Sequence, residues 1–140
     1  MTSGVTILLG VLALTAVVGV IFARRNGRLS QVEAPVSAAE KLTAQDLGAP
    51  LGERATLVQF STVFCAPCRT TRVNLKNLAE KSQGISYVDI DAESHLALVR
   101  RLNVMRTPTV LVLDADGVIA GRGSGDIRVP DVVASLGTVL

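Results

Sequence analysis

The stretch ATLVQFSTVFCAPCR, residues 55–69, places two cysteines at the junction of a strand and a helix. Ala55–Ser61 is short and rich in β-branched and apolar residues, which is typical of a buried strand. A helix is predicted over Pro67–Lys81, because apolar side chains recur along one face and proline fits a first helical turn. Cys65 and Cys68 therefore stand where that helix begins.

This position favours redox chemistry at the pair. Free N–H groups and the positive end of the helix dipole stabilise a thiolate at a helix N-terminus. The thiolate is the species that attacks a disulfide. A gap of two residues leaves Cys65 exposed before the first turn and puts Cys68 one turn further in, close enough to form a disulfide. We predict that Cys65 and Cys68 are catalytic, with Arg69 and Arg72 adding positive charge from the solvent side.

Three other uses of a Cys-x-x-Cys pair fit the sequence less well. A structural zinc site needs four ligands, but there is no second pair and His95 is the only histidine. Covalent haem attachment requires a histidine after Cys68, where this chain has Arg69. A purely structural disulfide would span more sequence. We therefore expect neither a metal nor a cofactor.

The chain after residue 47 alternates strands and helices, which predicts a compact α/β sandwich. The expected strands are Ile85–Ile90, Thr109–Leu113 and Val118–Gly123, the last two joined by a turn at 114–117. The expected helices after the cysteines are Glu93–Leu102 and Pro130–Leu140. We assign residues 47–140 to this domain.

Residues 4–23 contain no ionisable side chain and are long enough for a helix that crosses a bilayer. A cleaved signal peptide would have a basic residue before a shorter apolar core, and a buried soluble helix would need a larger partner core. We predict a single-pass transmembrane anchor. Residues 24–46 read as a juxtamembrane linker, with a short helix near Ala38–Ala44.

Arg24, Arg25 and Arg28 flank only the C-terminal end of the apolar segment. The positive-inside rule predicts that this end, and the domain after it, lie on the cytoplasmic side of the cell membrane. A long domain can cross regardless of charge, so an extracytoplasmic domain stays open. The chain has only 3% aromatic residues and no basic stripe, and we expect no nucleic-acid partner.

Residues 55–140 resemble the thioredoxin family. FCAPC stands where thioredoxins carry WCGPC, and Val88–Asp91 resembles the end of the family's next strand. Thr107-Pro108-Thr109 matches the loop whose proline is cis in that family, and Asp116-Gly117 and Gly125 match its later turns. The resemblance implies a thioredoxin-like three-layer α/β sandwich.

The resemblance also implies roles for individual residues. Cys65 would attack a substrate disulfide and Cys68 would resolve the mixed disulfide. Pro108, in cis, would lie beside the cysteines, and Thr107 would offer backbone groups to an extended substrate segment. The substrate-binding surface would also include Phe64, Ala66 and Pro67. Alternatively, Pro108 is an ordinary proline at the start of a strand.

Several residues depart from the family pattern. Gln59 stands where thioredoxins have a buried aspartate that helps to move protons, and Tyr87 stands where they have its lysine partner. Ser61 and Phe64 replace tryptophans. Without the buried carboxylate a general base is lost, so we expect slower turnover. Asp89 and Asp91 either relay protons or cap the end of their strand, and we favour the capping role. His95 is expected to face solvent.

The sequence thus predicts a membrane-anchored thiol–disulfide oxidoreductase that reduces protein disulfides. Its expected partners are protein disulfide substrates, an electron-donating reductase and the membrane, through residues 4–23. One alternative is an extracytoplasmic enzyme that serves exported proteins or cytochrome maturation. Another is a redox-sensing binding module with low turnover.

Overall fold

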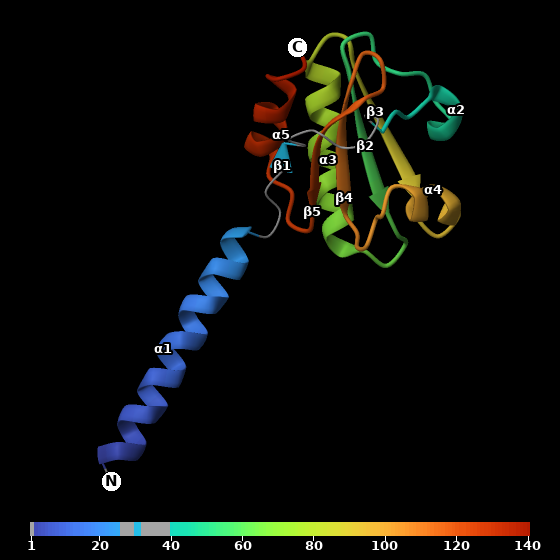
Figure 1. Ribbon diagram of the computed structural model, residues 1–140. Coiled ribbons are helices and arrows are strands. Elements are labelled where there is room, and N and C mark those ends of the chain that lie inside the picture. The colour runs from blue at the N-terminus through green and yellow to red at the C-terminus, as the bar shows by residue number, and fades with distance from the viewer. Residues whose placement is uncertain (1, 26–29, 32–39) are drawn as a thin grey trace.

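The computed structural model describes residues 2–25, 30–31 and 40–140 (Figure 1). An N-terminal helix, α1, covers Thr2–Arg25 and is followed by the two-residue strand β1, Ser30–Gln31. The other helices are α2 (Ala44–Leu47), α3 (Ala66–Lys81), α4 (Leu96–Arg101) and α5 (Val129–Leu136). The other strands are β2 (Ala55–Ser61), β3 (Ile85–Asp91), β4 (Thr109–Asp114) and β5 (Ile119–Ser124).

The strands form one mixed sheet in the order β1-β5-β4-β2-β3. β2 pairs in parallel with β3 and antiparallel with β4, and β5 pairs antiparallel with β4 and β1. Every residue of β2 is buried, as expected for a central strand covered on both faces. This central strand leads directly into the two cysteines.

Helices cover both faces of the sheet, which gives three layers (Figure 1). One core lies between the sheet and α2 and α4, and is formed by Leu42, Leu47, Val58, Phe60, Val88, Ile90, Leu98, Leu102, Val104, Leu111 and Leu113. The other lies beneath α3 and α5, and is formed by Ala55, Leu57, Leu75, Val110, Val112, Ile127, Val132 and Leu136. Alternate residues of β2 and β4 enter opposite cores, because successive side chains of a strand point to opposite faces. The predicted three-layer α/β sandwich is confirmed.

The folded region begins before the predicted boundary at residue 47. Leu42 is fully buried in the first core, and its backbone N–H donates to the carbonyl of Gly117 at 2.9 Å. A short helix lies at Ala44–Leu47, and a capping box between Thr43 and Asp46 starts it. The helix expected near 38–44 falls partly outside the described residues, and 40–43 are not helical. The N–H and hydroxyl of Thr43, with Arg101, hold the pKa of Asp46 below its usual value. Most of the predicted linker, 26–29 and 32–39, lies outside the described residues.

Two other helices are shorter than predicted. The helix expected over 93–102 begins at Leu96, because Asp91 accepts hydrogen bonds from Glu93 and Ser94 and holds the chain in a turn. The last helix ends at Leu136, four residues before the end of the chain. Neither difference moves an element that carries the cysteines.

The N-terminal helix α1 is exposed along its described length, with Phe22 at 71% the most exposed of its large apolar side chains. Its segment Gly4–Arg24 is long and apolar enough to cross a membrane. The hydroxyl of Thr15 donates to the carbonyl of Val11 at 2.8 Å, which satisfies it within the helix.

Candidate active site

The loop between β2 and α3 places Cys65 at the N-cap of α3. The backbone N–H of Cys65 donates to the carbonyl of Thr62 at 3.3 Å, which turns the chain after the strand. The helix then begins at Ala66, and Pro67 occupies a first-turn position where no N–H is needed. The N–H of Cys68 points back and donates to the sulfur of Cys65 at 3.2 Å. The cysteine sulfur thus takes the place of the oxygen in an ordinary helix cap.

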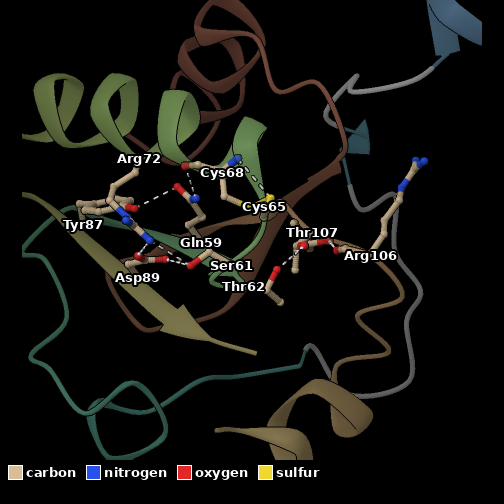
Figure 2. Close-up of a disulfide and its surroundings, with 11 residues drawn as sticks. Gln59, Ser61, Thr62, Cys65, Cys68, Arg72, Tyr87, Asp89, Arg106 and Thr107 are labelled. Carbon is tan, nitrogen blue, oxygen red and sulfur yellow. Dashed lines mark hydrogen bonds and ion pairs between the residues drawn. A yellow bond between two sulfur atoms is a disulfide. The ribbon is translucent and has the colours of Figure 1, made fainter. Parts of the chain in front are cut away.

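The two cysteines are joined as a disulfide, with their Cα atoms 5.2 Å apart (Figure 2). Cys65 is half-buried, whereas Cys68 is only 1% exposed. A partner that approaches from solvent therefore meets the sulfur of Cys65 first. Ala66 and Pro67, between the cysteines, are both exposed.

A neutral polar pair lies behind Cys68. The side-chain amide of Gln59, which is fully buried, donates to the backbone carbonyl of Cys68 at 2.9 Å. The hydroxyl of Tyr87 donates to the other end of the same amide, also at 2.9 Å. Burial, and then the negative charge of Asp89, raise the pKa of Tyr87 above its usual value, so the hydroxyl stays protonated. Gln59 and Tyr87 thus support the first turn of α3 without any charge.

A charged cluster lies next to this neutral pair. Arg72 of α3 forms an ion pair with Asp89 of β3 at 2.6 Å, although the sequence suggested that Arg72 only faces solvent. The hydroxyl of Ser61 donates to the other oxygen of Asp89 at 2.6 Å and accepts from Arg72 at 3.3 Å. This cluster ties together the helix and both strands that surround the cysteines (Figure 2).

A cavity of about 360 Å³ opens beside the disulfide. It is lined by Ser61, Thr62, Val63, Cys65, Cys68, Arg69, Arg72, Asp89 and Asp91. Both cysteines and the charged cluster therefore line one cavity. In the part of the chain that the structure describes, no group of three or more histidine, cysteine or acidic side chains is arranged to hold a metal ion.

The loop before β4 lies against the cysteine loop. The Thr107–Pro108 peptide bond is cis, and the hydroxyls of Thr107 and Thr62 are 3.5 Å apart. Pro108 is buried, and its carbonyl accepts the N–H of Gly125 at 2.9 Å. The backbone N–H and C=O of Thr107 form no hydrogen bond with the described residues, so they can bind an incoming segment.

Two further candidates, Asp91 and His95, form hydrogen bonds in the turn that follows β3. His95 is exposed, and its ring nitrogen Nδ1 lies 3.0 Å from the carbonyl of Asp91. The hydroxyl of Ser94 and the N–H of Glu93 bind Asp91 and lower its pKa. Asp91 thus caps the strand end as predicted, and His95 faces solvent as predicted. Asp89 does not cap the strand, because its carboxylate reaches across to Arg72 and Ser61.

The sequence did not identify two exposed apolar side chains in the loops before α3 and before β4. Val63 and Met105 are 75% and 84% exposed, and they lie in the loop between β2 and α3 and in the loop between α4 and β4. Phe64, which the resemblance placed at the site, is 94% exposed. The sequence signal for these residues was their apolar character within polar loops. Large apolar side chains are usually buried, so exposed ones can mark a binding surface.

Comparison with known proteins gives three results. The sequence model of the Thioredoxin family matches residues 39–134. The human thioredoxin domain-containing protein 2 is 35% identical over 71 residues, which span 49% of this chain but only 13% of the human protein. The thioredoxin of Pongo abelii is 24% identical over 97 residues, which span 69% of this chain and 86% of that protein.

The fold also matches solved structures. The crystal structure of reduced Schistosoma mansoni thioredoxin pre-protein superimposes with a TM-score of 0.56 at 22% identity, covering 64% of this chain and 82% of that one. The thioredoxin of Fasciola hepatica gives a TM-score of 0.56 at 20% identity, covering 64% and 84%. At this level of identity the likeness concerns the fold alone.

Proposed function

This chain belongs to the thioredoxin family, and we propose that it is a membrane-anchored thiol–disulfide oxidoreductase that reduces disulfides in proteins through Cys65 and Cys68. The observation that carries the proposal is the 3.2 Å hydrogen bond from the N–H of Cys68 to the sulfur of Cys65. When the disulfide is reduced, the same N–H and the helix dipole stabilise a negative charge on that sulfur. Cys65 is then the nucleophile.

The proposed reaction has two exchanges. The Cys65 thiolate attacks a substrate disulfide, forms a mixed disulfide and releases one substrate thiolate. The Cys68 sulfur, having lost its proton, then attacks Cys65, which restores the Cys65–Cys68 disulfide and releases the second substrate thiolate. Two electrons pass to the substrate, so a reductase must return two electrons to this chain before the next turnover.

Exposed apolar side chains in two loops support a protein substrate. Val63 and Phe64 lie in the cysteine loop and Met105 in the loop before β4, and each has most of its surface in solvent. Burying them against a partner contributes about 25 cal/mol for each Å² removed from water. An extended substrate segment would pair with the backbone groups of Thr107, which form no hydrogen bond with the described residues, and pass over Ala66 and Pro67.

We further propose that residues 4–23 anchor the protein in the cell membrane as a single span. The helix exposes an uninterrupted apolar surface, for which a bilayer is the suitable environment. Arg24, Arg25 and Arg28 favour a cytoplasmic position for the domain.

The side of the membrane can be measured by thiol labelling. After treatment with a permeant reductant, Cys65 and Cys68 should resist a membrane-impermeant maleimide in intact cells and react once the cells are permeabilised. A variant in which both cysteines are serine is the matched control, because the chain has only two cysteines. Labelling in intact cells would instead favour the extracytoplasmic enzyme for exported proteins or cytochrome maturation.

The activity itself is tested by reduction of insulin disulfides with the full chain in detergent and dithiothreitol as electron donor. We expect many insulin molecules to be reduced per molecule of this protein, because an activated thiolate is regenerated in each cycle. A single turnover, with no acceleration over dithiothreitol alone, would contradict a reductase and favour the redox-sensing binding module.

A further inference from the structure

Cys68 must lose a proton before its sulfur can resolve a mixed disulfide, yet it is 1% exposed. A buried thiol is a poor nucleophile until a nearby group accepts that proton. The polar groups directly behind it are the amide of Gln59, which cannot accept the proton at neutral pH, and the protonated hydroxyl of Tyr87. The group that accepts the proton of Cys68 must therefore be a different one.

The cavity beside the disulfide supplies a carboxylate. Asp89 is the register partner of Gln59 in the parallel pair β2–β3, so its side chain leaves the sheet on the same face, beneath the first turns of α3. Asp89 lines the same 360 Å³ cavity as Cys68, and its side chain is 25% exposed. The cavity is much larger than the roughly 30 Å³ that one water molecule occupies. A proton can therefore travel from Cys68 to Asp89 through water.

The carboxylate of Asp89 is also held in one place. Arg72 of α3 binds one oxygen, and Ser61, at the end of the strand that leads into the cysteine loop, binds the other. The charged groups that share this cavity with Asp89 are Arg69 and Arg72 of α3 and Asp91 of β3. Asp91 is turned toward Glu93 and Ser94 in the following loop.

We propose that Asp89 accepts the proton of Cys68 during the resolving step. This inference rests on the proposed function and adds a residue to it. In the mixed disulfide, the Cys68 thiol gives its proton through water to Asp89. The Cys68 thiolate attacks the sulfur of Cys65, the Cys65–Cys68 bond forms, and the bond between Cys65 and the substrate breaks. The electron pair leaves with the substrate thiolate, which takes up a proton from Asp89 or solvent.

The two steps can be followed separately in the full chain in detergent. The reduced protein is mixed with dithiobis(nitrobenzoate), and the absorbance of thionitrobenzoate is recorded. The first equivalent is released when Cys65 attacks, and the second when Cys68 resolves the mixed disulfide. Asp89→Asn should slow the second phase by about 10- to 100-fold and leave the first unchanged, since general bases contribute on that order or more. Asp89→Glu should restore most of the second phase.

Two variants separate proton transfer from a structural effect. Asp91→Asn alters a carboxylate of the same cavity and should leave both phases unchanged. Arg72→Gln breaks the same ion pair as Asp89→Asn but keeps the carboxylate, so it should slow the second phase much less. The rate–pH profile of the second phase should contain an ionisation in the wild type that is missing in Asp89→Asn.

The proposal is overturned if Asp89→Asn leaves the second phase unchanged, slows both phases equally, or behaves like Arg72→Gln. Dithiobis(nitrobenzoate) is a small aromatic disulfide, so both phases can be measured without a protein substrate. A wild type that shows both phases but does not reduce insulin would contradict the proposed function while the assignment of Asp89 still stands on its own result.

Discussion

Cys65→Ser is expected to lower the rate of insulin reduction by about 10³-fold or more, because removing a catalytic nucleophile removes the covalent route altogether. A serine hydroxyl at this position would receive the same N–H of Cys68 but would not ionise at neutral pH. The fold should be unaffected, since the sulfur caps the helix and an oxygen can replace it. The initial rate of insulin reduction, with thermal unfolding of the reduced proteins as the control for folding, measures this effect.

Cys68→Ser should give a different result. Cys65 can still attack, but the mixed disulfide is no longer resolved from within the chain, so a covalent complex with the substrate accumulates. Because the chain has only two cysteines, any such complex must be bonded through Cys65. If Cys68→Ser turned over as fast as the wild type, or if Cys65→Ser formed the covalent complex instead, the roles of the two cysteines would be wrong.

The sequence predicted the strand–cysteine–helix unit well because its determinants are local. Apolar periodicity identifies β2 and α3, and a proline in the first turn marks the start of the helix. The position of Cys65 at the helix N-terminus follows from these two features. The fold class then followed from the alternation of strands and helices and from the family resemblance.

Contacts between distant segments could not be predicted in the same way. Arg72 lies in a helix and Asp89 in the strand that follows it. The residues next to each of them do not indicate that the folded chain brings the two side chains within 2.6 Å. The packing of residue 42 against the domain could not be predicted for the same reason. Leu42 lies in a polar stretch that reads as a linker, and only the packing of the first core shows that its side chain is fully buried.

Leu42→Ala is accordingly expected to lower the free energy of unfolding of the domain by about 2–5 kcal/mol, the usual cost of truncating a buried leucine. Domains of this size are stable by only about 5–15 kcal/mol, so the loss is a large share of the total. The measurement is urea unfolding of a fragment that begins at Glu40, with and without the substitution. Lys41→Ala, at an exposed neighbouring position, is the matched control and should change the free energy little.

A fragment that begins at Leu47 should be less stable still, because it loses more than one side chain. It lacks Leu42 itself, the backbone hydrogen bond from Leu42 to Gly117 at 2.9 Å and the bond from Ile119 to Glu40 at 3.2 Å. It also lacks the Thr43 cap that starts α2, a contribution of about 1 kcal/mol. We expect its urea midpoint to lie below that of Leu42→Ala in the longer fragment. Equal midpoints for the fragments from Glu40 and Leu47 would show that residues 40–46 do not stabilise the domain, and that the first core is complete without them.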